Sequence, residues 1–206
     1  MKRLITTFIL VVSLIFAVGT QVANADLITS SSDAALAGAT VIDFEGQAKG
    51  TYTSIAIGDV TLTANNNLLR IDNVYGSQYN MTGTYLENGS YGFNSMTIDF
   101  GAETTAFGFN WGASDNPWVL SAYDASSNLL ESYNLPITGG SNSGDFVGLA
   151  TSGIDYAILS TVSSGGDWVL IDNITYNVDN VVPVPGAVLL GLLGLSAAGI
   201  KLRKQS

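Results

Sequence analysis

Short apolar segments separated by turn-forming residues recur about every 8 to 12 residues through the middle of the chain, and no long helical pattern interrupts them. In 95–100, the apolar residues Met96, Ile98 and Phe100 alternate with polar ones, which is the period of a half-buried strand. Such strands bury one face against a second sheet. The pattern therefore predicts an all-β domain over 26–181, an antiparallel β-sandwich or jelly roll.

The expected strands are rich in β-branched and aromatic residues. They cover residues 39–44, 52–57, 60–63, 68–71, 95–100, 105–111, 118–124, 128–133, 145–150, 155–161 and 167–177. Two pairs are close enough in sequence to form hairpins, 95–100 with 105–111 and 118–124 with 128–133. Residues 71–92 are rich in Asn, Gly and Tyr, which predicts a long loop.

The first 25 residues have the parts of a secretory signal peptide. A basic pair opens the segment, residues 4–18 are mostly apolar, and Ala23 and Ala25 match the small-x-small pattern that signal peptidase reads. We therefore expect cleavage before Asp26 and export of the residues that follow. The alternative is an uncleaved anchor helix.

The C-terminal residues 182–206 also divide into three parts. A Pro-containing motif, 182–186, consists of Val182, Pro183, Val184, Pro185 and Gly186. An uncharged apolar run, 187–200, is followed by a basic tail, 201–206, with Lys201, Arg203 and Lys204. The fourteen residues of the run span about 21 Å as a helix, against about 30 Å of bilayer hydrocarbon. Because the run has no polar face and the cations can snorkel, a single transmembrane helix is favoured over a buried core helix.

This order of parts resembles the PEP-CTERM sorting signal of Gram-negative bacterial exported proteins. The resemblance implies an exosortase as processing partner, a transient stay in the inner membrane, and delivery to the cell surface or extracellular space. The family's usual motif is Val-Pro-Glu-Pro, and Val184 stands here where Glu is usual. Residues 41–45, 107–109 and 168–174 also look like ectodomains common in this family and like jelly-roll carbohydrate-binding modules. A structural or adhesive role in an exopolysaccharide or biofilm matrix is what the resemblance implies.

Charge is distributed unevenly along the chain. All 17 acidic residues lie in 26–181, where Lys49 and Arg70 are the only basic residues, so this domain has a formal charge of −15. Nucleic acid is therefore excluded as a partner, because phosphate binding needs clustered cations.

The chain contains no His and no Cys. This composition removes His-based nucleophilic catalysis, His or thiolate zinc sites, and disulfides. We predict a protein without enzymatic activity. A carboxylate-dependent glycoside hydrolase is the alternative, since that chemistry needs only two acidic side chains.

The first and last strands of a jelly roll often lie side by side, which would bring Asp43 and Glu45 close to the last strand. Asp172 and Asn173 lie on that last strand. Resemblance to jelly-roll binding modules implies a structural calcium ion there, and calcium takes carboxylate, amide and backbone oxygens as ligands. The hypothesis is that Glu45 and Asp172 bind calcium, helped by Asp43, Asn173 or backbone oxygens. The alternative is that Asp172 and Asn173 bond to a neighbouring turn while Glu45 is solvated.

Aromatic rings on exposed loops can stack on sugar rings, while neighbouring Asn and Asp side chains supply polar contacts. Trp118 follows an Asp-Asn-Pro segment at a loop edge, and Tyr75 and Tyr79 lie in the long expected loop. These three residues are the predicted glycan contacts. The alternative places the tryptophans in the sandwich core, which we expect for Trp111 and Trp168. A module that recognises one glycan is therefore the second functional hypothesis, beside the matrix role.

Overall fold

The computed structural model describes residues 26–65, 68–89, 95–140, 144–161, 163 and 166–178. The predictions for the signal peptide, with Ala23 and Ala25, and for the tail 182–206 concern residues outside these ranges. Within the described ranges, no helix has the length and apolar character needed to cross a membrane. The described strands pair in antiparallel fashion throughout, so the prediction of an all-β antiparallel domain is confirmed.

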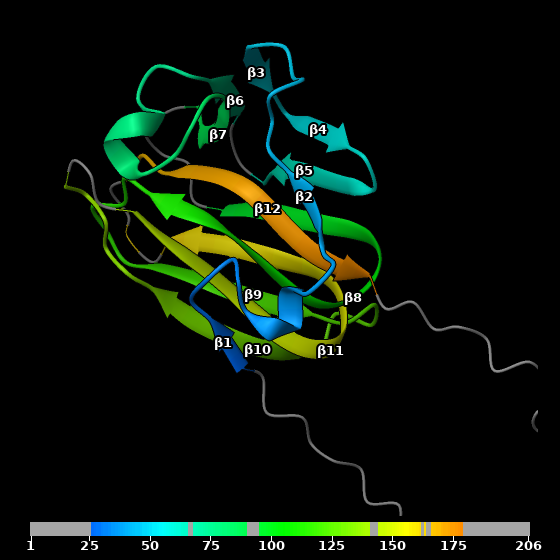
Figure 1. Cartoon of the computed structure of the whole chain (residues 1–206). Coiled ribbons are helices and arrows are strands. Elements are labelled where there is room, and N and C mark those ends of the chain that lie inside the picture. The colour runs from blue at the N-terminus through cyan, green and yellow to red at the C-terminus, as the bar shows by residue number, and fades with distance from the viewer. Residues whose placement is uncertain are drawn as a thin grey trace, which may run out of the picture.

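Two long strands organise the sheet (Figure 1). β8 (Ser95–Gly112) and β11 (Gly144–Thr161) each have 18 residues and pair with one another along most of their length. The first half of β8 also pairs with β5 (Val60–Ala64), whereas its second half pairs with β12 (Leu170–Val178). A strand of this length can therefore belong to two different layers.

Strand β11 changes neighbours in the same way. It pairs with β1 (Asp26–Ile28) through its first half and with β9 (Trp118–Tyr123) through its second. At the changeover the register between β8 and β11 shifts, and Gly101 and Gly153 have positive φ angles of 67° and 82°. Glycine adopts this conformation without steric cost. The two strands bend together here, so that one continuous sheet folds into two packed layers.

The prediction that 95–100 and 105–111 form a hairpin is wrong, because both segments belong to the single bent strand β8. The turn-forming residues 101–103 are exposed where β8 bends, but the chain does not reverse, because Thr104 and the residues after it continue to pair with β11. The two strands expected at 145–150 and 155–161 are likewise one strand.

The remaining elements are shorter. They are β2 (Thr40–Ile42), β3 (Gly50–Tyr52), β4 (Ser54–Ile57), β6 (Leu69–Asp72), β7 (Tyr85–Asn88) and β10 (Leu129–Leu135), with the 3-10 helices η1 (Ala34–Leu36) and η2 (Gly76–Tyr79). β9 and β10 form the second predicted hairpin. β2 pairs with β12, with Ile42 opposite Ile174, so the expected adjacency of the strands predicted at 39–44 and 167–177 is confirmed. The first strand of the described ranges, β1, pairs with β11 instead.

Aromatic side chains from both layers meet in the core. The rings of Trp111 and Trp118 make edge contact with centroids 5.7 Å apart, and the rings of Phe100 and Phe107 are 5.0 Å apart. All four side chains are fully buried. Large rings dominate the apolar area of a core, and each pair adds about 0.5–1.5 kcal/mol beyond that burial. These contacts hold the layers together, and the prediction that Trp111 is a core residue is confirmed.

The prediction of a loop over 71–92 is wrong for residues 85–88, which form strand β7. Leu86 lies between Ile71 on β6 and Ile171 on β12. All four residues of β7 are buried, including Glu87 and Asn88. Buried polar side chains require partners, and the partners of these two lie at a surface groove.

Candidate binding groove

A groove of about 530 Å³ opens beside β6, β7 and η2. Its lining residues are Arg70, Tyr75, Gln78, Tyr79, Glu87, Asn88, Gly89 and Trp168. Arg70 and Glu87 lie opposite one another on β6 and β7 and form the floor. The aromatic residues come from around η2 and from the segment just before β12. This volume lies within the range of pockets that hold small ligands.

Three aromatic rings stand around the opening. Trp168 makes edge contacts with Tyr75, at a centroid distance of 5.5 Å and an interplanar angle of 90°, and with Tyr79, at 5.6 Å and 81°. Tyr75 is 45% exposed, while Tyr79 and Trp168 are partly buried. Edge contact is a favoured geometry for aromatic pairs. The three rings therefore support one another and present apolar surface to the groove.

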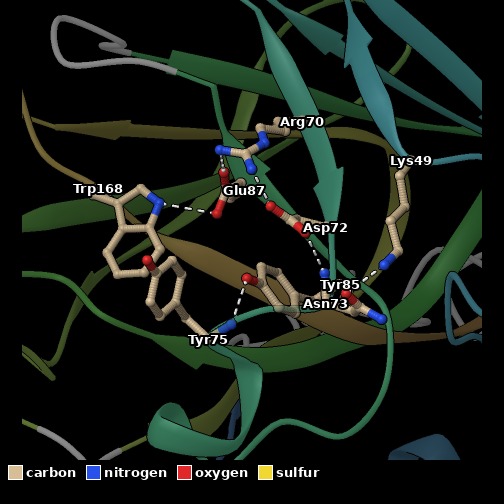
Figure 2. Close-up of polar contacts among 8 residues, drawn as sticks. All are labelled: Lys49, Arg70, Asp72, Asn73, Tyr75, Tyr85, Glu87 and Trp168. Atoms are coloured by element: carbon tan, nitrogen blue, oxygen red, sulfur yellow. Dashed lines mark hydrogen bonds and ion pairs between the residues drawn. The ribbon is translucent and has the colours of Figure 1, made fainter.

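The carboxylate of Glu87, only 4% exposed, lies between Trp168 and Arg70 (Figure 2). Its Oε2 accepts a hydrogen bond from Nε1 of Trp168 at 3.0 Å, and its Oε1 lies 3.1 Å from Nη1 of Arg70. Arg70 also donates to Asp72 through Nη2. Burial raises the pKa of Glu87, whereas the hydrogen bond from Trp168 and the charge of Arg70 lower it. These contacts fix the indole ring and compensate the buried charge.

Tyr85 holds Tyr75 in its position at the groove. It is fully buried, and its hydroxyl accepts a hydrogen bond from the backbone N–H of Tyr75 at 3.0 Å. Burial raises the pKa of Tyr85 to about 12, so the phenol stays protonated at neutral pH. Gly76 packs against the same ring so closely that a Cβ atom there would lie 2.9 Å from Cδ1 of Tyr85. The start of η2 thus requires a glycine, and its packing holds Tyr75 in place.

Asp167 anchors the segment that carries Trp168. Its buried carboxylate accepts hydrogen bonds from the backbone N–H groups of Asp115 and Asn116, at 3.1 and 3.0 Å. It also accepts from Nε1 of Trp118 at 2.9 Å and from the backbone N–H of Trp168 at 2.9 Å. One carboxylate thus joins the 115–116 loop, the core and the groove wall.

Asn88 holds the segment that carries Trp168 from the other side. Its Nδ2 donates to the backbone carbonyl of Asp167, and its Oδ1 accepts from the backbone N–H of Val169 at 2.7 Å. Sequence reasoning missed these anchoring residues, because a Glu-Asn-Gly run is typical of a turn. The one strand signal was the Tyr-Leu pair of β7, bounded by Gly83 and Gly89.

Of the three predicted glycan contacts, two line the groove and one does not. Tyr75 and Tyr79 both line the groove. Trp118 does not, because it is 0% exposed and its indole N–H is bonded to Asp167, so its prediction as a glycan contact is wrong. Trp168, expected in the core, instead forms part of the groove wall.

Asp172, on β12, carries a second unusual carboxyl group. It is 1% exposed; its Oδ1 accepts a hydrogen bond from the N–H of Asn173 at 2.7 Å, while its Oδ2 has no hydrogen-bond partner among the described residues. The pKa of Asp172 is raised to about 7, first by burial and then by the charges of Glu45 and Asp43, against the lowering effect of the backbone of Asn173 and Thr82. The pairing of β2 with β12 thus brings Asp43 and Glu45 within electrostatic range of Asp172.

Glu45 is bound to the protein rather than merely solvated. Its Oε1 accepts a hydrogen bond from the N–H of Thr84 at 2.9 Å, whereas Asn173 donates from Nδ2 to Oδ1 of Asn110 at 3.1 Å. An oxygen such as Oδ2 of Asp172 suits a hard cation, but the described residues contain no group of three or more acidic side chains placed to hold a metal ion. Calcium at this position stays a prediction.

No protein-family model and no curated protein matches this chain. Among solved structures, it is similar to TmCBM61 in complex with β-1,4-galactotriose, with a TM-score of 0.41 and 12% identity over 59% of this chain and 90% of that one. It is also similar to the K2 cleaved adhesin domain of Lys-gingipain, with a TM-score of 0.45 and 10% identity over 68% of this chain and 98% of that one. A third similar structure is a mutant of the family 29 carbohydrate-binding module CBM29-2, with a TM-score of 0.34 and 10% identity over 74% of this chain and 85% of that one. All three scores lie below 0.5, so these likenesses carry no conclusion about function.

Proposed function

We propose that this chain is an exported protein that binds polysaccharide through the groove and has an adhesive or structural role in an extracellular matrix. The observation that carries the proposal is the arrangement of Trp168, Tyr75 and Tyr79 around a floor on which Arg70 and Glu87 form an ion pair. Sugar rings have apolar C–H faces and polar edges. The groove offers a matching combination of apolar rings and polar groups.

Preorganisation supports binding by these rings. The indole of Trp168 is fixed by its hydrogen bond to Glu87, and its backbone is held by Asp167. Side chains that are already ordered lose little conformational entropy when a ligand arrives. The exposed amide of Gln78 and the remaining N–H groups of Arg70 are positioned to bond to hydroxyl groups at the edge of a sugar.

Binding is favoured over hydrolysis by the contacts of the carboxylates at the floor, Glu87, and next to it, Asp72. A glycosidase needs one carboxyl group as acid and a second as base or nucleophile. Here Glu87 and Asp72 are both engaged by the same guanidinium group of Arg70. A proton donor and a free nucleophile are therefore not arranged on this floor as that reaction requires.

Affinity electrophoresis of the full chain in gels containing single polysaccharides, supported by a glycan array, tests the proposal. We expect retardation by at least one polymer, and we expect Trp168→Ala to weaken it at least tenfold. Tyr123→Ala is the matched control. Tyr123 is also partly exposed and stacks on Tyr156 with centroids 5.1 Å apart, but it lies on β9, outside the groove. Equal losses in both variants, or no retardation of the wild type, would refute the proposal.

Export and surface sorting form the second part of the proposal, and they rest on the sequence of the two ends of the chain. We propose cleavage after Ala25 and, at the tail, processing by an exosortase near Pro185. The intact mass of the protein recovered from its native host, measured for each cell fraction, tests both steps. A mass that ends near Pro185, outside the inner membrane, is expected. A full-length tail in the inner membrane would instead identify a tethered domain and contradict exosortase processing.

A further inference from the structure

The charge balance of the groove narrows the class of glycan. Arg70 is the cation of the groove lining, and both of its nitrogens Nη1 and Nη2 already face carboxylates, those of Glu87 and Asp72. The other basic residue among the described ranges, Lys49, donates to Oδ1 of Asn73. Glu87 lines the groove and Asp72 lies behind it on the same guanidinium, so this cluster has a formal excess of one negative charge, within a domain whose formal charge is −15.

An anionic sugar entering the groove would therefore meet no uncompensated cation. Its carboxylate or sulfate would lie near Glu87, whose surroundings are mostly desolvated and therefore screen charge poorly. An anionic group that accepted from a remaining N–H of Arg70 would still lie beside the carboxylates of Glu87 and Asp72, whose two charges outweigh the single charge of the guanidinium. A neutral hydroxyl group carries no such cost, because it can donate to a carboxylate oxygen and accept from a free guanidinium N–H at the same time.

We infer that the groove selects uncharged glycans and discriminates against glycans that carry uronic acid or sulfate groups. This inference rests on the proposed function, because it assigns the ligand class of the same groove. Arg70, with a side chain 46% exposed, still offers unpaired N–H directions to neutral hydroxyls. Glu87 acts as the selectivity residue, because it both orients Trp168 and supplies the charge that repels anions.

Matched polymer pairs test the inference. The full chain is run at pH 8 and low salt through native gels containing hydroxyethylcellulose or carboxymethylcellulose, dextran or dextran sulfate, and galactan or polygalacturonic acid, with mobility normalised to a polymer-free gel. We expect retardation by at least one neutral member and at least about tenfold weaker retardation by its anionic partner, the effect of one unit charge at short range.

Variants locate the discrimination within the molecule. Glu87→Gln keeps an acceptor for the Trp168 indole and removes the charge, so the ratio of anionic to neutral polymer retardation should rise about tenfold. Glu103→Gln is the matched control, because it removes the same charge from an exposed position at the bend of β8. Asp72→Asn removes the other carboxylate that faces Arg70 and provides a second variant should Glu87→Gln melt far below the wild type.

The outcomes separate the inference from the proposed function. If no polymer of any charge retards the wild type, the proposed function itself fails. If an anionic polymer binds as tightly as its neutral partner, glycan binding stands and the selectivity is refuted. An equal gain of anion binding in Glu103→Gln and Glu87→Gln would also refute it, because the discrimination would then come from the overall charge.

Discussion

The indole Nε1 of Trp118 donates a hydrogen bond to Oδ2 of Asp167 at 2.9 Å across a sequence separation of 49 residues. Trp118 lies in the core and Asp167 directly precedes the groove residue Trp168, so this bond connects the two regions. The same carboxylate accepts the N–H groups of Asp115 and Asn116. With the backbone N–H of Trp168 as the fourth donor, the buried carboxylate is fully satisfied.

Replacing this carboxylate should loosen the core and the groove together. In Asp167→Asn, the amide NH₂ would replace one carboxylate oxygen, so N–H groups that bond to that oxygen in the wild type would face another donor. We expect a loss of about 2–4 kcal/mol of stability, which lowers Tm by roughly 5–15 °C for a domain of this size. Differential scanning calorimetry measures the change. Asp115→Asn is the control, since Asp115 is exposed, and its Tm should move by less than about 2 °C. Similar shifts in both variants would contradict the anchoring role.

Gly83 should tolerate no side chain, because Glu45 occupies the space. Its φ is +70°, and a Cβ atom would lie 1.6 Å from Oε1 of Glu45, the oxygen that accepts from Thr84. Gly83→Ala should therefore destabilise the fold by about 2–3 kcal/mol, the sum of a backbone cost and a lost hydrogen bond. Gly38→Ala isolates the backbone cost, since Gly38 has a φ of +76° and open space around it. Equal losses in urea unfolding would show that the Glu45 contact contributes nothing.

Local periodicity predicted much of the sheet. The alternation at 95–100 and the hairpin of β9 and β10 follow from side-chain period and turn residues within one short window. The bend of β8 could not be predicted in this way. Gly101 permits both a reversal and a kink, and the choice depends on β11, which pairs with β8 on both sides of the bend. Pairing over such a sequence distance leaves no local signal.

The groove was predictable only where its residues resemble loop residues. Tyr75 and Tyr79 lie in a polar, Gly-rich stretch and were expected to be accessible, as the structure has them. Trp118 and Trp168 exchanged their expected places, because the burial of a tryptophan depends on what covers it. Trp118 packs against Trp111 in the core and its indole is bonded to buried Asp167, whereas Trp168 lines the groove beside Tyr75 and Tyr79.

Ligand binding should be visible in the fluorescence of Trp168. This residue is the tryptophan of the groove, while Trp111 and Trp118 are fully buried. A neutral polysaccharide that retards the wild type should therefore shift or quench the emission, and Trp168→Phe should remove most of that change while keeping a ring for stacking. An undiminished spectral response in Trp168→Phe would place the ligand elsewhere.

Stability should fall as pH rises, because of Asp172. Its folded-state pKa of about 7 lies above the ordinary value of 3.8, so the folded protein binds this proton more tightly than the unfolded chain does. The stability from this group is complete below about pH 4 and is lost as pH rises to 7. At about 1.4 kcal/mol per pKa unit, the loss reaches about 4 kcal/mol at most. The pKa of Asp172 is raised first by burial and then by the charges of Glu45 and Asp43.

Thermal melting between pH 4.5 and 8 measures this dependence. Asp172→Asn should flatten the curve, because an amide does not titrate, whereas Glu103→Gln, which removes an exposed charge, should keep the wild-type slope. A wild-type curve that is already flat, or a slope that survives in Asp172→Asn, would show that the carboxyl of Asp172 does not govern it.

Calcium should compete with this proton if the predicted site exists. A cation would bind the ionised form of Asp172 and satisfy its Oδ2, with Glu45 and Asp43 adding negative charge nearby. At pH 8, millimolar calcium should raise Tm relative to excess EDTA, and a calcium concentration one hundred times the dissociation constant corresponds to about 2.7 kcal/mol. Asp172→Asn should lose the response and Glu103→Gln should retain it. An identical wild-type Tm in calcium and in EDTA would end the calcium hypothesis and leave the protonated carboxyl as the form that stabilises the fold.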